Sequence, residues 1–147
     1  MPTLLEKAIR LALDAHQGQT DKAGAPYLLH PLRMMLRMET EEERIVAVLH
    51  DVVEDSETSF EDLRRLGCSK TIVDAVDALT HRYGEAYEEY LVRAGANPLA
   101  RRVKRADLED NMDLRRIDNP TDADFQRLLR YRRAWSLLGE AGTPDDD

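Results

Sequence analysis

The sequence predicts an all-α fold, a single-domain bundle of about seven or eight helices. Apolar residues recur at helical spacing through most of the chain, and no segment shows the apolar–polar alternation of a half-buried strand. Signals for helix starts and ends also divide the chain at short intervals. With 147 residues, 42% of them apolar and 34% charged, the chain is long enough to bury one hydrophobic core.

Helix starts in the first half of the chain are marked by capping boxes, in which a Ser or Thr and an acidic residue three positions later satisfy free backbone amides. The pairs with this spacing are Thr3 with Glu6, Thr40 with Glu43, and Ser59 with Asp62. Gly67 is placed to end the third of these helices. Between the first two, glycines and a proline mark a loop over residues 18–29, and His30-Pro31 opens a short helix to about residue 38.

The second half of the chain is expected to be helical as well. Apolar spacing predicts helices over about residues 70–80, 85–94, 97–116 and 121–139. Asn97-Pro98 is a strong start signal, because asparagine caps a helix and proline fits its first turn. Gly139 is expected to end the last helix. We therefore assign residues 1–140 to the domain and residues 141–147 to a flexible acidic tail.

Composition limits the classes of partner and compartment. The formal net charge of −8 argues against long nucleic acids, since a polyanion requires a basic face, but it permits a small nucleotide. The single cysteine, Cys68, excludes an intrachain disulfide and indicates a reducing compartment. No apolar run approaches the ~20 residues of a membrane span, and the N-terminus lacks a signal-peptide pattern. We expect a cytoplasmic protein without membrane contact, and homo-oligomerisation is left open.

The stretch VLHDVVED (48–55) places charged groups inside a helix that otherwise has a buried, aliphatic character. Burying such groups without partners is costly. Glu54 lies four residues after His50 and three after Asp51, and Asp55 lies four after Asp51. In one continuous helix all four would line a single edge, which indicates a functional site.

The adjacent His-Asp pair predicts a metal site, because imidazole nitrogens and carboxylate oxygens are both good ligands for divalent cations. Two ligands rarely suffice, and the sequence offers another imidazole and another carboxylate, the latter in VKRADLEDN (103–111). The predicted metal ligands are His30, His50, Asp51 and Asp107. Water on such an ion loses a proton readily and can attack phosphorus. Glu54 and Asp55 are predicted catalytic residues that position this water or pass a proton to the leaving oxygen.

Three stretches resemble the HD-domain metal-dependent phosphohydrolases, and most of all the hydrolase half of the RelA/SpoT enzymes and the small stand-alone alarmone hydrolases. They are AHQGQTDKAGAPYLLHP (15–31), VLHDVVEDSETSFEDL (48–63) and VKRADLEDNMDL (103–114). The resemblance covers residues 1 to about 138. It implies the HD-domain fold and removal of the 3′ pyrophosphate from (p)ppGpp, the alarmone of the stringent response. The chain has no room for the separate synthetase domain, so alarmone synthesis is not expected.

The resemblance also implies roles for individual residues. The positions that align with metal ligands are His30, His50, Asp51 and Asp107, and the metal of the family is usually manganese. Glu54 and Asp55 align with residues that serve the attacking water, and Asn111 aligns with a nucleotide contact. We therefore expect a divalent metal cofactor, Mn²⁺ in the first instance, and a small nucleotide as substrate.

Two departures concern the side of the site that would hold the base. The family typically has Arg-Lys where this chain has Asp21-Lys22, and that arginine packs on guanine, which an aspartate cannot do. After Asn-Met the family commonly has Arg-Thr, and this chain has Asp113-Leu114. A different phosphorylated nucleotide, as in an NADPH phosphatase, is therefore an alternative substrate. Two non-enzymatic alternatives are a nucleotide-sensing module with the same pocket and a buried hydrogen-bond network.

Lys22 and Lys104 are the candidate phosphate contacts. For Lys22 the alternative is a solvated loop lysine. For Lys104, which lies one turn before Asp107 on the same helix face, the alternative is a carboxylate partner.

The remaining polar residues of note have ordinary interpretations. His16 is expected to make a structural hydrogen bond near the end of the first helix. Glu109 and Asp110 are expected to point away from the metal face into solvent. A run of arginines is interpreted as a solvated face, with a docking surface as the alternative: Arg127, Arg130, Arg132 and Arg133.

Overall fold

The computed structural model describes residues 1–140, with side chains through Gly139. The predicted all-α fold is confirmed over this part of the chain, where extended segments pair only in an isolated bridge of Thr20 with Pro26. The elements are α1 (Leu4–Ala15), α2 (Leu29–Arg37), α3 (Glu41–Leu49), α4 (Val52–Asp55), α5 (Phe60–Leu66), α6 (Lys70–Ala78), α7 (Tyr87–Ala96), α8 (Pro98–Asn111), the 3-10 helix η1 (Leu114–Arg116) and α9 (Asp122–Glu140). Because α4 is a single turn, eight longer helices build the described bundle. The tail predicted over residues 141–147 lies outside the described residues.

Most helix boundaries follow the capping signals. Thr3, Thr40 and Ser59 each accept a hydrogen bond from the backbone amide three residues on, and the acid at that position bonds back to the amide of the cap. Asn97 caps the start of α8 in the same direction. Gly67 ends α5 at φ +113°, a left-handed conformation that residues with a Cβ rarely adopt. Local chemistry therefore sets these boundaries.

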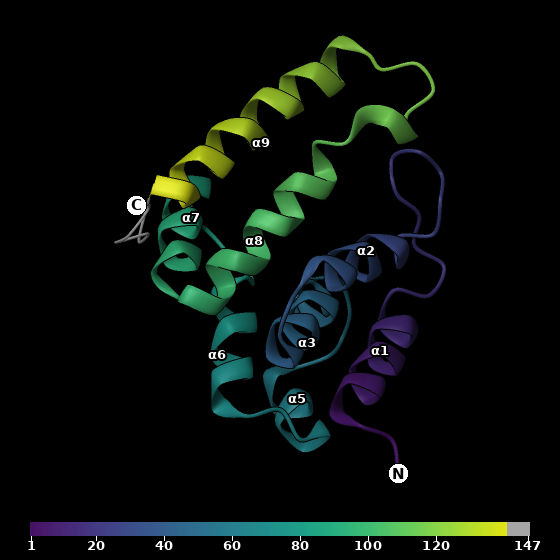
Figure 1. Cartoon of the computed structure of the whole chain (residues 1–147), viewed down its shortest axis with the longest axis vertical. Helices are drawn as coiled ribbons and strands as arrows, with labels where there is room; N and C mark the ends of the chain where they lie inside the picture. Colours follow the sequence, from purple (N-terminus) through teal and green to yellow (C-terminus); the bar gives the residue numbers. More distant parts are fainter. Residues whose placement is uncertain (141–147) are drawn as a thin grey trace.

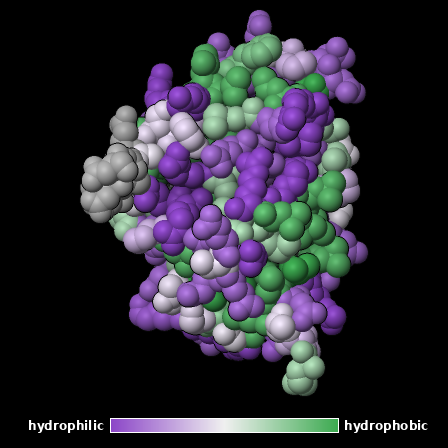
Figure 2. Space-filling model, in the orientation of Figure 1, coloured by the Kyte–Doolittle hydropathy of each residue, from purple (hydrophilic) through white to green (hydrophobic). Residues whose placement is uncertain are grey.

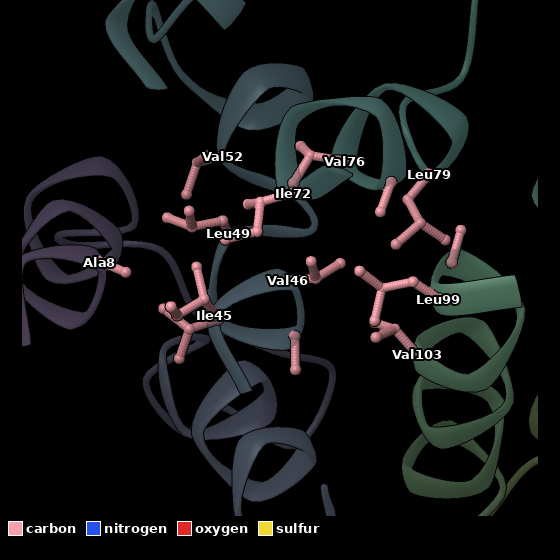
Figure 3. Packing of buried hydrophobic residues seen from close by; sticks show 14 of the residues in the cluster. Ala8, Ile45, Val46, Leu49, Val52, Ile72, Val76, Leu79, Leu99 and Val103 are labelled. Carbon is pink, nitrogen blue, oxygen red and sulfur yellow. The ribbon is translucent and has the colours of Figure 1, made fainter. Parts of the chain in front are cut away.

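The main hydrophobic core is built around α3. Residues 45–49 are all buried, and α3 packs against α1, α2, α6 and α8. In Figure 3, Ile45 lies on the side of Ala8 in α1, and Val46 lies on the side of Val103 in α8. A smaller apolar cluster attaches α9 to α7 and α8: Leu91, Leu108, Ala134 and Leu138. The chain segment that leads into the HD pair is thus the most enclosed part of the fold.

The helix expected through residues 48–55 is interrupted, so the prediction of one continuous helix is wrong. α3 ends at Leu49, and Asp51 has φ −110° and ψ 0° before α4 begins. In a continuous helix the carbonyl of Ala47 would accept the amide of Asp51. It accepts instead a hydrogen bond of 2.7 Å from Nδ1 of His50. The side chain of His50 thus takes the place of a backbone amide at the Ala47 carbonyl, next to the candidate site residues.

Two other helix ends differ from the prediction. α8 ends at Asn111, because Asp113 caps the separate helix η1 by accepting a backbone amide with its side chain. α9 does not end at Gly139 but continues through it to the last described residue. A Cβ at Gly139 would lie 3.4–3.6 Å from the guanidinium atoms of Arg105. These are ordinary van der Waals distances, so Gly139 lies within α9 beside a side chain of α8 and does not act as a helix stop.

The elements that carry the predicted site residues are neighbours in space. α2, α3 and α8 pack on one another, and α9 lies alongside α8 (Figure 1). The loop between α1 and α2 lies beside the end of α8 and η1 (Figure 1). The face drawn in Figure 2 is largely hydrophilic with separate apolar areas. None of the described helices combines the length and the apolar character needed to cross a membrane.

We expect Asn97→Ala to lower the free energy of unfolding by about 1 kcal/mol, because the amide of Ala100 loses its side-chain partner at the start of α8. A loss of this size lowers the melting temperature by roughly 2–4 °C, measured by thermal denaturation with circular dichroism. Asn97→Asp is the control, since aspartate can accept the same bond. Equal losses in the two variants would contradict the assigned cap.

Candidate metal centre

Two imidazoles and one carboxylate from three different segments meet in the interior. His30 lies in the first turn of α2, His50 follows α3, and Asp107 belongs to α8. Their ligand atoms all lie within 4.8 Å of one another, and each residue is at most 6% exposed. Oδ1 of Asp107 lies 2.8 Å from Nε2 of His30 and 3.6 Å from Nε2 of His50. Among the described residues no other group of His, Cys, Asp and Glu has this spacing.

Asp51, the fourth predicted ligand, lies at the edge of this group. Its Oδ2 is 3.1 Å from Nε2 of His50 and also accepts a hydrogen bond from the hydroxyl of Tyr27. Burial raises the pKa of Asp51, but the charge of His50 and these hydrogen bonds lower it overall. The ring of Tyr27 lies edge-on to His16, at 4.8 Å between centroids. His16 makes the structural hydrogen bond predicted for it, 2.9 Å to Gln19.

In its neutral form, His50 presents an unprotonated nitrogen to the group. Its Nδ1 contacts the Ala47 carbonyl, which can only accept, so Nδ1 carries the proton. In the neutral ring Nε2 then has a lone pair, and this buried atom has no hydrogen-bond donor. An unpaired buried acceptor is costly, and a cation at this position would remove the cost.

His30 has the same arrangement. Nδ1 lies 2.6 Å from Oδ2 of Asp110, and Nε2 lies 2.8 Å from Oδ1 of Asp107. With the proton of the neutral ring on Nδ1, Nε2 and the Asp107 carboxylate are two acceptors face to face. A shared cation, either a proton or a metal ion, is needed between them. The donor set therefore fits a divalent metal, for which imidazole nitrogen and carboxylate oxygen are ordinary ligands.

The buried carboxylate of Asp107 is compensated by positively charged or protonatable side chains on several sides. Burial raises the pKa of Asp107, but Lys104 and the two imidazoles outweigh it and hold the pKa well below its usual value. Nζ of Lys104 lies 2.6 Å from Oδ2 of Asp107, and Asn111 donates to Oδ1 at 3.2 Å. Lys104 thus has the carboxylate partner that was the alternative to a phosphate contact. Burial lowers the pKa of both imidazoles, but the carboxylates raise it above the usual histidine value.

Asp110 is wholly buried, so the expectation that it points into solvent is wrong. Its carboxylate contacts the ring of His30. The sequence did contain the signal, because Asp110 follows Asp107 by three residues and positions i and i+3 share a helix face. Glu109, with its side chain 43% exposed, lies outside the site as predicted.

Glu54 and Asp55, the predicted catalytic carboxylates, lie on α4 just beyond the HD pair. Glu54 accepts a hydrogen bond from the backbone amide of His81. Burial raises the pKa of both carboxyls and the negative charge of Asp51 adds to this, while the His81 amide opposes it at Glu54. A carboxylate with a raised pKa is a better proton acceptor than an ordinary one.

A pocket of about 360 Å³ lies between the α1–α2 loop, the end of α8 with η1, and the first half of α9. Lys22 and Asn111, two of the predicted substrate contacts, line it. Tyr27 also lines the pocket and donates to Asp51, so the pocket and the metal group share a wall. The lining carries both charges and two aromatic rings: Lys22, Arg116 and Arg127; Asp21, Asp113 and Asp124; Tyr27 and Tyr131.

Two pocket residues differ from expectation. Arg127, assigned to a solvated face, lines the pocket and pairs with Asp124. α9 lies outside the three motifs, so no motif pointed to it. Asp21 uses its carboxylate within its own loop, where Oδ1 accepts the amides of Ala23 at 2.9 Å and Ala25 at 3.0 Å. It caps the loop, a role that an arginine at this position could not take.

Sequence comparison places the chain beside segments of longer proteins, although no protein-family model matches it. It is 34% identical over 80 residues to the bifunctional (p)ppGpp synthase/hydrolase SpoT of Escherichia coli K12, covering 52% of this chain and 11% of SpoT. It is 27% identical over 158 residues to the guanosine-3′,5′-bis(diphosphate) 3′-pyrophosphohydrolase of Aquifex aeolicus. This match covers 92% of this chain and 22% of the A. aeolicus protein. It is 36% identical over 120 residues to the GTP pyrophosphokinase of Streptomyces coelicolor, a match that covers 74% of this chain and 14% of that protein. The matches thus span less than a quarter of these relatives.

A solved structure covers nearly the whole chain. It is that of a metazoan orthologue of SpoT that hydrolyses ppGpp, and it matches with a TM-score of 0.78 and 22% identity over 97% of this chain and 90% of that one. The chain has the fold of this SpoT orthologue. The match confirms the fold class, and together with the sequence similarity it confirms the resemblance predicted from the three motifs. This fold brings one residue from each of the three motifs together: His30, His50 and Asp107.

We expect Mn²⁺ to raise the melting temperature of the metal-free wild-type protein and to leave Asp107→Asn almost unaffected, because Asp107 is the ligand shared by both imidazoles. An ion at 100 times its dissociation constant stabilises the folded state by about 2.7 kcal/mol. Differential scanning calorimetry with and without chelator measures the shift. Glu109→Gln, which removes an exposed carboxylate from the same helix, is the matched control. No shift in the wild type with Mn²⁺ or with other divalent ions would contradict the metal centre.

Proposed function

We propose that this protein is a metal-dependent phosphohydrolase that removes the 3′ diphosphate of (p)ppGpp and releases it as pyrophosphate. The observation that carries the proposal is the pair of buried imidazole nitrogens that face the Asp107 carboxylate next to a pocket of nucleotide dimensions. The fold shared with a ppGpp-hydrolysing SpoT orthologue and the similarity to the A. aeolicus pyrophosphohydrolase support the choice of substrate.

In this proposal His30, His50 and Asp107 hold a divalent ion, Mn²⁺ in the first instance, with Asp51 as the fourth ligand at the edge of the group. Such an ion, when bound, lowers the pKa of water and withdraws charge from phosphoryl oxygens. The chain contributes two imidazoles and a carboxylate that are already buried and held by three separate segments: His30, His50 and Asp107. Little reorganisation is then needed when the ion binds.

Glu54 and Asp55 are the proposed proton carriers. Their raised pKa values suit a group that takes a proton from the attacking water and returns it to the leaving 3′ oxygen. The amide of His81 holds one oxygen of Glu54 and leaves the other free for this transfer. The hydrolysis breaks the bond between the 3′ oxygen and phosphorus and gives pyrophosphate and a 5′-phosphorylated guanosine.

The nucleotide is proposed to lie in the 360 Å³ pocket, with its 3′ phosphates toward the metal group. Lys22 supplies positive charge from the loop, and Asn111 contributes an amide between the pocket and Asp107. Lys104, whose ammonium lies beside Asp107, provides positive charge next to the scissile diphosphate. These three residues are the proposed substrate contacts.

A different phosphorylated nucleotide is the second candidate substrate, and the observation that favours it is Asp21. The carboxylate of Asp21 caps its own loop where the alarmone hydrolases stack an arginine on guanine. The pocket instead offers Tyr27 and Tyr131 to a base. Aromatic stacking accepts every base, so we propose weaker selection for guanine than in those relatives.

We expect Glu54→Gln to lower the turnover of ppGpp by about 10²–10⁴-fold, because the amide cannot accept the proton of the attacking water. Manganese content stays at the wild-type level, since Glu54 is not a ligand. Anion-exchange chromatography of the products and elemental analysis of the protein measure the two quantities. Glu57→Gln, at an exposed position just after α4, is the control and should keep wild-type turnover. Unchanged turnover in Glu54→Gln would remove this residue from the mechanism.

A panel of ppGpp, NADPH and nucleoside di- and triphosphates, each with several metals, separates the candidate functions. Release of pyrophosphate from ppGpp at the highest rate is the expected result. Faster release of phosphate from NADPH would favour the second candidate. Tight nucleotide binding without product from any member would contradict hydrolysis and indicate a sensing module.

A further inference from the structure

Asp110 is a buried carboxylate that the proposed chemistry does not use. It lies in the last turn of α8 with no exposed surface. Oδ2 lies 2.6 Å from Nδ1 of His30, while Arg33 donates to Oδ1 at 2.8 Å and to Oδ2 at 2.9 Å. Arg116 donates to the backbone carbonyl of Asp110 at 3.0 Å and lies 3.4 Å from Oδ2.

The two arginines alone can compensate the charge of Asp110. A forked pair between guanidinium and carboxylate is among the strongest hydrogen-bonded ion pairs in proteins. Arg33 and Arg116 place two permanent positive charges at this carboxylate, so its charge is compensated when the His30 ring is neutral. The contact with His30 therefore matters chiefly for the position of the proton on the imidazole.

The neutral His30 ring has one proton and two carboxylates within reach. With the proton on Nδ1, the ring donates to Asp110, and the lone pair of Nε2 faces Asp107. With the proton on Nε2, the ring donates to Asp107 and that nitrogen is closed to a metal. The contact with Asp110, at 2.6 Å, is shorter than the contact with Asp107, at 2.8 Å. The geometry therefore favours the tautomer that is open to a metal.

We propose that Asp110 is a positioning residue of the metal centre, which takes the proton of the neutral His30 ring at Nδ1 and keeps Nε2 open toward the ion. It acts through His30 and contacts neither ion nor substrate. The inference rests on the proposed metal centre. Loss of such a partner weakens metal binding by about 10–100-fold in proteins where it has been removed.

The first test is the position of the proton in the metal-free wild-type protein. Long-range ¹H–¹⁵N spectra at alkaline pH, where the ring is neutral, report which nitrogen of His30 is protonated, and the His30→Gln variant assigns the signals. We expect the proton on Nδ1 in the wild type and a larger share on Nε2 in Asp110→Asn. This measurement needs no metal and no substrate.

The second test is the affinity for Co²⁺, followed by its visible absorption. We expect Asp110→Asn to bind Co²⁺ about 10–100-fold more weakly than the wild type and with an altered spectrum. Arg33→Met is the matched control, because it removes a partner of Asp110 and leaves the contact with His30 in place. A purely structural role would lower the melting temperature of both variants without separating their Co²⁺ affinities.

The outcomes distinguish this inference from the proposed function. A wild-type His30 ring protonated on Nε2, or equal Co²⁺ affinities in the wild type and Asp110→Asn, would overturn the role of Asp110. Wild-type protein that binds neither Co²⁺ nor Mn²⁺ would contradict the metal centre and the proposed function with it, whereas metal binding with equal affinity in Asp110→Asn would overturn the role of Asp110 alone.

Discussion

The carboxylate of Asp107 is the group on which the arrangement of the site depends. It is buried within reach of two imidazoles and an ammonium group, and such a charge stays in an apolar interior only when it is compensated. The two imidazoles come from distant parts of the chain, and the ammonium group of Lys104 comes from the preceding turn of α8. The packing of α2, α3 and α8 against one another therefore sets the geometry of the candidate metal centre.

The core and the site share one piece of backbone. The buried run at the end of α3 holds the middle of the apolar core, and His50 follows it without an intervening loop. The His50 ring donates a hydrogen bond to the carbonyl of Ala47 at the point where the helix breaks. This backbone contact also fixes the tautomer of the neutral His50 ring. The buried α3 helix before His50 and the contact of its ring with the Ala47 carbonyl together leave Nε2 of His50 little freedom to move.

Local signals in the sequence predicted most of the fold and part of the site. Capping residues such as Thr40 and Asn97 act on amides three residues away, so their effect can be seen in a short window. The HD pair and Asp107 were identified because chemistry and spacing agreed, and the structure brings His50 and Asp107 together. Asp110 was misassigned: its spacing from Asp107 placed it on the same helix face, but the partners from α2 and η1 that compensate its burial could not be read from that spacing. The wall of the pocket that α9 contributes depends on contacts far apart in the chain for the same reason.

The attachment of α9 has a consequence for how the protein exchanges its ligand. α9 packs on the smaller apolar cluster, whereas α2, α3 and α8, which position the candidate ligands, are held together by the main core. Local opening is easiest where few apolar groups are buried, so α9 is the element of the pocket wall that we expect to open first. On the proposed function, a separation of α9 from α8 would open the pocket for nucleotide exchange while the group of His30, His50 and Asp107 keeps its shape.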